Sequence, residues 1–301
     1  MNILVVGGAG FIGSHLTERL LAEGHNVDVV DLLSTGSLAN LAIARAAGGV
    51  LKIHTLDAGA DEFQALVAMR EPDVIYHLAC LPPGVPPEQA AGDTIRTTMA
   101  VLEAARGLGD VKVVVALSAV SLYGDVPSKE QPVKESQPWN PVGVRGVITR
   151  SLADLLAVYR EEHAVEFIAL ALANVYGPRQ RPEGGVVAAF EQSLRDGVTP
   201  MVHGDGRQTR DFLYIDDAVD ALVRAAHKGS GLVINVGTGV ATSIRDLWAL
   251  MAGPDGRQPA PSPRRPRDVA RLAISPTRAR IQLGWAPWTE LSVGLRGLGR
   301  S

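Results

Sequence analysis

Residues 3–13 read ILVVGGAGFIG, a short apolar run that leads directly into a glycine-rich turn. The run Ile3–Val6 is rich in β-branched residues and is typical of a strand that is buried on both faces. The spacing of the apolar residues after the turn predicts a helix over residues 14–23. Residues 27–30 predict a second strand, which ends at Asp31. This order of strand, glycine turn, helix, strand and acidic residue predicts a βαβ unit that binds a dinucleotide.

The turn contains the spacing Gly8-x-Gly10-x-x-Gly13. Glycine permits a tight strand-to-helix turn and lets a pyrophosphate approach the N-terminal end of the helix. Asp31 follows Gly13 by 18 residues, so its carboxylate can hold a ribose 2′-hydroxyl and would repel a 2′-phosphate. The pattern favours NAD over NADP, although the glycines could also serve only to relieve crowding in a tight turn. The predicted cofactor-binding residues are Gly7, Gly10, Phe11, Ile12, Gly13, Asp31, Asp57 and Ala79.

The composition limits the classes of protein to which the chain can belong. A length of 301 residues with 46% hydrophobic content can bury a large core in one or two joined domains. The net charge of −3 favours neither a nucleic-acid nor a membrane partner. The chain enters a strand almost at once, which predicts no signal peptide, and Cys80 is its only cysteine. We therefore expect no internal disulfide and a cytoplasmic location, with Cys80 acting as a small buried apolar residue.

The rest of the chain alternates strands and helices. Strands are predicted over residues 51–56, 74–79, 111–117, 167–172 and 232–236, and helices over residues 62–69, 93–105, 150–162, 186–194, 218–226 and 244–251. Asp216 and Asp217 are expected to cap the helix at 218, and Ser243 the helix at 244. Such alternation predicts an α/β fold of the Rossmann type, a doubly wound parallel sheet with ligands at the carboxyl ends of its strands.

Several further motifs carry a resemblance to a known family. They are Gly7–His15, Asp31 with Leu33–Gly36, His77–Ala79, Leu122–Asp125, Asn174–Pro178, Gly204–Phe212 and Asn235–Gly239. Over nearly its whole length the sequence resembles the extended short-chain dehydrogenases/reductases that act as nucleotide-sugar epimerases and dehydratases. The resemblance implies a dinucleotide-binding domain over residues 1–173 with about 212–236. It also implies a smaller C-terminal α/β substrate domain, over residues 174–211 and 237–301, that closes over a nucleotide-diphosphate (NDP) sugar.

The resemblance also implies which residues contact the NDP-sugar. Asn174 matches an asparagine beside the diphosphate, and Arg210 matches the arginine of an R-D-F motif. Arg265 precedes Pro266 and matches a third family position, although residues 264–267 could equally form a solvated basic loop. Two arginines can clamp a pyrophosphate through bidentate hydrogen bonds. Further candidates for substrate contacts are Arg207 and His203.

The catalytic positions of this family are changed in this sequence. The family uses a Tyr-x-x-x-Lys pair and a Ser or Thr, and the tyrosine position falls on Arg145 and the lysine position on Thr149. The Ser or Thr position falls on Ala119, with Ser118 and Ser121 nearby but offset. Arginine stays protonated at neutral pH and cannot act as a general base, and threonine carries no charge that would lower a neighbouring pKa. The substitutions argue against oxidation of the sugar followed by its reduction.

The first function we expect is therefore a non-redox one. The chain resembles flavin-independent mutases of this fold that interconvert the pyranose and furanose forms of an NDP-hexose. Positive charge from Arg210, Arg265 and Arg145 would stabilise the diphosphate as the anomeric bond breaks, and a divalent cation such as Mg²⁺ or Mn²⁺ could assist. Candidate metal-binding carboxylates are Asp125, Glu130, Glu135 and Asp211, without diagnostic spacing.

Two alternatives stay open. An NAD-dependent epimerase or dehydratase could use another base, for which Tyr123 and His77 are the available side chains. The chain could also be a catalytically silent protein that binds NAD or a nucleotide sugar. The candidate catalytic residues are Arg145, Tyr123, Ser118 and Thr149. The resemblance also implies a homodimer, formed through the helices at 93–105 and 150–162.

Overall fold

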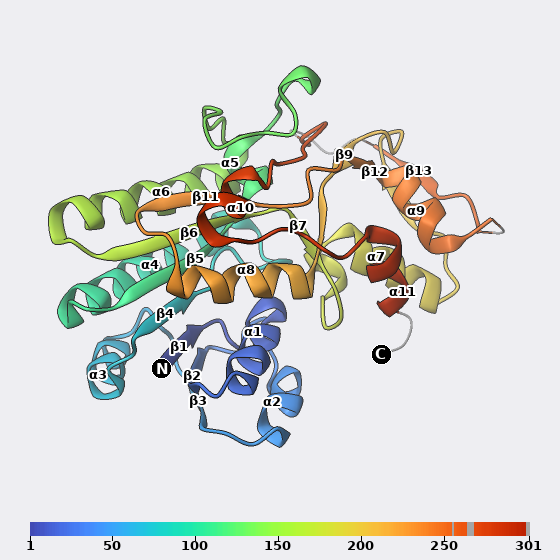
Figure 1. Ribbon diagram of the computed structural model, residues 1–301. Coiled ribbons are helices and arrows are strands. Elements are labelled where there is room, and N and C mark those ends of the chain that lie inside the picture. The colour runs from blue at the N-terminus through green and yellow to red at the C-terminus, as the bar shows by residue number, and fades with distance from the viewer. Residues whose placement is uncertain (255, 264–267, 299–301) are drawn as a thin grey trace.

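The computed structural model describes residues 1–254, 256–263 and 268–298 (Figure 1). Its centre is a seven-stranded parallel sheet with the strand order β11-β6-β5-β4-β1-β2-β3. The strands are β1 (Asn2–Val6), β2 (Asn26–Asp31), β3 (Leu51–Thr55), β4 (Val74–His77), β5 (Lys112–Ser118), β6 (Glu166–Leu172) and β11 (Leu232–Val236). The chain runs outward from β1 in both directions, so the predicted doubly wound sheet is confirmed.

Helices cover both faces of this sheet (Figure 1). One face packs against α1 (Phe11–Ala22), α2 (Ala42–Ala46), α8 (Ile215–His227) and α10 (Thr277–Leu283). The other packs against α3 (Asp61–Arg70), α4 (Pro87–Leu108), α5 (Ala119–Tyr123) and α6 (Gly143–His163). Within β1, Ile3 and Val5 enter the first core and Leu4 and Val6 the second. This division explains why the strand reads as an unbroken apolar run.

A smaller part beyond the carboxyl ends of the strands contains short elements (Figure 1). They are β7 (Asn174–Tyr176), α7 (Val186–Arg195), β8 (Met201–His203), β9 (Thr209–Arg210), β10 (Phe212–Tyr214), β12 (Thr242–Ser243), α9 (Ile244–Ala252), β13 (Ala260–Ser262) and α11 (Leu291–Leu298). The described residues also form three short 3-10 turns: Leu38–Leu41, Ser128–Glu130 and Pro182–Gly184. The smaller part has its own core, in which the rings of Phe190 and Trp248 meet edge to face at 5.0 Å.

The boundary between the two predicted domains is not simple. The division into residues 1–173 with 212–236, and 174–211 with 237–301, stays a prediction. Within the last of these ranges, α10 and Trp285 pack against the large sheet rather than the smaller core. The Trp285 indole N–H donates to the Asp217 carbonyl oxygen of α8 at 2.9 Å. The segment of α10 and Trp285 therefore returns to the dinucleotide-binding part, and α11 after it packs into the smaller core.

Three expectations about helix ends have different outcomes. Ser243 caps α9, because its hydroxyl accepts from the Asp246 backbone N–H at 3.0 Å. The expected acidic cap of α8 is wrong, because the Asp217 carboxylate accepts instead from the backbone and hydroxyl of Thr289. Helix α4 starts at Pro87, six residues before its predicted start. Proline is favourable at a first helical position, because the backbone N–H that it lacks would have no partner within the helix there. No helix in the described part of the chain is both long and apolar enough to span a bilayer.

Candidate active site

The glycine turn between β1 and α1 forms a close-packed cradle in which Gly7 and Gly13 leave no room for a side chain. A Cβ atom at Gly13 would lie 2.1 Å from the Gly7 carbonyl oxygen, so a side chain there would force the helix away from the strand. A Cβ at Gly7, whose φ is +84°, would lie 2.9 Å from the Ala79 nitrogen at the end of β4. Gly10 precedes α1 and lines the cavity described below. The first N–H groups of α1 are thus left accessible to an anion, as dinucleotide binding requires.

The carboxylate of Asp31 is held in a fixed orientation at the end of β2. One of its oxygens accepts from the Ala9 N–H at 2.9 Å, and the other accepts from the Leu33 N–H at 2.8 Å. Each oxygen keeps a further lone pair that can accept from a ribose hydroxyl. The oriented carboxylate and the close-packed glycine cradle together fit an NAD molecule.

A large cavity of about 1140 Å³ extends from this cradle toward the smaller part of the protein. Its lining includes all the residues predicted to bind the cofactor: Gly7, Gly10, Phe11, Ile12, Gly13, Asp31, Asp57 and Ala79. The lining also includes Asn174 of β7, His203 of β8 and Arg210 of β9, all predicted substrate residues. The structure therefore brings the predicted cofactor residues and three of the predicted substrate residues together around one cavity, whose volume exceeds that of most single-ligand pockets.

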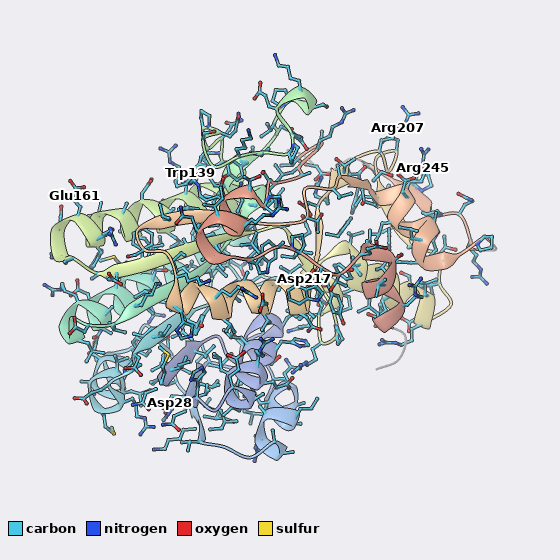
Figure 2. All side chains as sticks on the ribbon, viewed as in Figure 1. Asp28, Trp139, Glu161, Arg207, Asp217 and Arg245 are labelled. Atoms are coloured by element: carbon cyan, nitrogen blue, oxygen red, sulfur yellow. The ribbon has the colours of Figure 1, made fainter. Side chains whose placement is uncertain are left out.

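The predicted arginines of the substrate site differ in their positions. Arg210 lines the cavity, donates to the Asp268 carboxylate at 2.7 Å and to the Val269 carbonyl at 2.7 Å, and is thereby held in place. Arg207 does not line the cavity: its side chain is 76% exposed and lies on the outer surface near Arg245 (Figure 2). The substrate contact of Arg207 therefore stays a prediction, made for a side chain that lies outside the lining of the cavity. Arg265 lies outside the described residues.

The positions that correspond to the family's catalytic residues surround the end of β5. Ser118 ends this strand, and the Ser121 hydroxyl donates to the Ser118 hydroxyl at 3.0 Å. Both serines line the cavity, whereas Ala119 between them is fully buried. Arg145 and Thr149 of α6 also line it. Hydroxyl groups and a guanidinium therefore stand where the family has a phenol and an ammonium.

The side chain of Arg145 crosses to the loop that follows β4. Its guanidinium donates to the Leu81 carbonyl oxygen at 2.6 Å, and the Thr149 hydroxyl donates to the carbonyl of Arg145 at 2.8 Å. Burial lowers the pKa of Arg145, but an arginine keeps its charge at neutral pH. Leu81 has φ +44°, and its N–H donates to the Thr94 hydroxyl at 3.2 Å. Arg145 and Thr94 thus fix this loop from two helices, a role that the sequence did not reveal.

Neither of the alternative bases considered from the sequence reaches the cavity. Tyr123 is fully buried, and its hydroxyl donates to the Asn235 side-chain oxygen at 2.9 Å. Burial raises the pKa of Tyr123 to about 12. His77 is also fully buried against the Thr98 hydroxyl at 2.9 Å, and burial lowers its pKa to about 4. The catalytic role of Tyr123 stays a prediction, and its hydroxyl is engaged by Asn235 inside the core.

The carboxylates considered as metal ligands have other partners. Asp211 is buried and accepts from the backbone of Thr238, Gly239 and Ile274. Asp125 accepts from the Ala270 N–H, Glu130 from the Gln137 amide, and Glu135 from the Asn235 N–H. Across residues 1–254, 256–263 and 268–298, no group of three His, Cys, Asp or Glu side chains could hold a metal ion.

Sequence reasoning missed one arginine that joins the two parts of the protein. Arg179 follows the Asn174–Pro178 motif and donates to both carboxylate oxygens of Glu18 in α1, at 2.7 and 2.9 Å. It also donates to His15 at 2.8 Å. The only feature of the sequence that could have indicated this role is the position of Arg179 directly after the Asn174–Pro178 motif.

The fold and the cavity define a Rossmann-type protein with a dinucleotide cradle beside a second binding region. The sequence profile of the NAD-dependent epimerase/dehydratase family matches residues 3–237, and the chain belongs to this family. It is 40% identical to the UDP-glucose 4-epimerase of Mycolicibacterium smegmatis, over 98% of this chain and 96% of that protein.

Solved structures agree with this assignment. A UDP-glucose 4-epimerase of Thermotoga maritima, with UDP-glucose, is 33% identical and superposes with a TM-score of 0.92 over 99% of this chain and 97% of that one. The UDP-glucose 4-epimerase of Thermus thermophilus in complex with NAD is 29% identical, with a TM-score of 0.87 over 98% and 97% of the two chains.

Proposed function

We propose that this protein binds NAD and an NDP-hexose side by side and isomerises the sugar, most directly as a UDP-hexose 4-epimerase. The observation that carries the proposal is the shared cavity, with Asp31 and the glycine cradle at one end and Asn174 and Arg210 at the other. The similarity to UDP-glucose 4-epimerases over almost the whole chain supports uridine as the base and C4 as the reacting carbon.

Different residues of the cavity bind the cofactor and the sugar nucleotide. The first turn of α1 binds the pyrophosphate of NAD, and Asp31 orients its adenosine ribose. When bound, NAD would accept the hydride of the sugar C4–H, and the proton of the C4 hydroxyl would pass to water in the cavity, because Arg145 and Thr149 supply no base. Ser118 accepts from both the N–H and the hydroxyl of Ser121, so its own proton is directed to another acceptor, such as a sugar oxygen. Arg210, fixed by Asp268, holds the diphosphate.

A second candidate is the non-redox conversion between pyranose and furanose forms of the NDP-hexose. The observation that favours it is the guanidinium of Arg145 in the position of the family's phenol, because arginine cannot take the hydroxyl proton that a sugar loses when it is oxidised. Ring contraction instead needs positive charge on the diphosphate, which Arg210 supplies. In this case NAD would have a structural role, and a divalent cation bound with the diphosphate could assist.

A panel of UDP-, GDP- and dTDP-hexoses, incubated with and without added NAD and Mg²⁺, tests both candidates through products resolved by chromatography and NMR. A C4 epimer that requires NAD supports the first proposal. A furanose that forms without NAD supports the second and contradicts the first. Binding of the sugars without turnover would contradict both and leave a silent binding protein.

We also propose that the protein is a homodimer. Helices α4 and α6 pack side by side, and α6 exposes Val144, Val147 and Val158, with Val147 54% exposed. Exposed apolar residues on a long helix favour burial against a second copy. Light scattering after gel filtration tests this: a mass of one chain contradicts it.

A further inference from the structure

The arginines that line the cavity differ in whether a carboxylate neutralises them. Five of them are described: Arg96, Arg145, Arg179, Arg181 and Arg210. Four lie close to a carboxylate: Arg96 to Asp57 at 2.9 Å, Arg179 to Glu18 at 2.7 Å, Arg181 to Glu183 at 3.6 Å and Arg210 to Asp268 at 2.7 Å. Among the residues that the structure describes, no carboxylate oxygen lies within 4.0 Å of the Arg145 guanidinium.

Arg145 also keeps most of its hydrogen-bonding capacity. A guanidinium has five N–H donors, and one nitrogen of Arg145 donates to the Leu81 carbonyl. Its other donors have no acceptor within the described part of the chain. Glu88 favours the charged form from a distance but makes no contact. A partly buried cation without an anionic partner is costly, and an anionic ligand would offset that cost.

The position of Arg145 points to the sugar rather than to either nucleotide. Arg145 lies in the first turn of α6, where a Cβ atom at the next residue, Gly146, would come within 2.9 Å of the Ser121 carbonyl oxygen. Its guanidinium therefore reaches the loop after β4 and its helix packs on the turn after β5, and Ser118 and Thr149 line the same cavity. The dinucleotide cradle follows β1, on the other side of β4 in the sheet.

We infer that Arg145 binds a carboxylate on the hexose, so that the preferred substrate is an NDP-hexuronic acid rather than a neutral NDP-hexose. The inference rests on the proposed function, because it names the substrate class of the same site. A planar guanidinium with several free N–H groups matches a carboxylate through two parallel hydrogen bonds. The family's phenol offers no such charge, so the substitution at this position changes specificity as well as chemistry.

Isothermal titration of the NAD-loaded protein with UDP-glucuronate, UDP-glucose and UDP tests the inference. GDP-mannuronate and GDP-mannose are measured as a second pair, in case guanosine is the preferred base. We expect the uronate to bind about 10- to 100-fold tighter than the matching neutral sugar, as one or two charge-assisted hydrogen bonds would give. In Arg145→Gln this preference should disappear, so that the uronate binds no tighter than the matching neutral sugar.

Two further variants make the experiment decisive. Arg150→Gln is the matched control, because Arg150 is on the same helix, is 51% exposed and does not line the cavity. It should keep the full preference. Arg145→Lys keeps the charge but loses the planar fork, so it should keep only part of the preference. If Arg145→Gln fails to fold, the result for Arg145→Lys is compared directly with the wild type.

The possible outcomes separate the inference from the proposed function. Equal affinities for the uronate and the neutral sugar in the wild type would overturn the inference and leave the proposed function intact. A preference for the uronate that persists in Arg145→Gln, or stays complete in Arg145→Lys, would also overturn it. Failure of every UDP and GDP compound to bind would overturn both.

Discussion

Replacement of Gly10 by alanine tests the dinucleotide cradle without disturbing the fold. The backbone of Gly10 has φ −76°, which alanine adopts freely. An added Cβ atom would meet one heavy atom within 4 Å, the Gly7 carbonyl oxygen at 3.2 Å. The methyl group would therefore extend mainly into the cavity, where the glycine spacing places the pyrophosphate.

The expected loss of affinity follows from this geometry. A methyl group that holds a pyrophosphate back by about 1 Å lengthens hydrogen bonds of about 2.9 Å beyond the range in which they contribute. Two charge-assisted hydrogen bonds at about 1.5–3 kcal/mol each amount to about 3–6 kcal/mol. Gly10→Ala should therefore weaken NAD binding by about 10² to 10⁴-fold.

The assay is titration calorimetry with NAD on protein stripped of nucleotide, together with thermal unfolding. Gly92→Ala is the matched control, because a Cβ at this position in α4 meets nothing within 4 Å. It should leave NAD binding unchanged and stabilise the protein by about 0.5–1 kcal/mol. Unchanged NAD affinity in a folded Gly10→Ala protein would refute the assignment of the cradle.

Three other predictions concern stability and chemistry. The buried His77 has a pKa of about 4, below about 6.5 in the unfolded chain, so the unfolded chain binds more protons between these values. The free energy of unfolding in urea should therefore fall by about 2 kcal/mol from pH 7 to pH 5, and an equal fall in His77→Gln would contradict this. Asp28→Asn should cost about 1–3 kcal/mol, because the buried carboxylate accepts two hydrogen bonds from Arg70 at 2.8 and 3.0 Å; a change below about 0.5 kcal/mol would show that the pair contributes little. If the native reaction is non-redox, the double variant Arg145→Tyr with Thr149→Lys should not increase its rate, and a large gain would exclude that route.

The large sheet could be predicted because its signals are local. Each signal lies within a few consecutive residues: the apolar run Ile3–Val6 predicts a strand, the glycine spacing predicts the turn after it, and Asp31 marks the end of the next strand. The short strands of the smaller part, such as β9 (Thr209–Arg210), contain two or three residues and are too short to show a periodicity. Their pairing depends on segments elsewhere in the chain, and no single window of sequence contains that information.

The candidate site was predictable to a similar extent. The cofactor residues follow a fixed spacing, and all of them line the cavity. The contact between Arg145 and Leu81 joins residues that are 64 apart, so the sequence gives no sign that the arginine fixes the loop. Arg207 and Tyr123 lie outside the lining of the cavity for a related reason, since position in a motif does not reveal the direction in which a side chain points.

The simultaneous binding of the two ligands tests the central claim most directly. Native mass spectrometry of the protein with NAD and a UDP-hexose or UDP-hexuronate should detect a complex that holds one molecule of each per chain. Either ligand should also bind in the presence of a saturating concentration of the other. Mutual displacement of NAD and the UDP-sugar, or retention of only one of them, would contradict the account of a shared cavity with two adjoining sites.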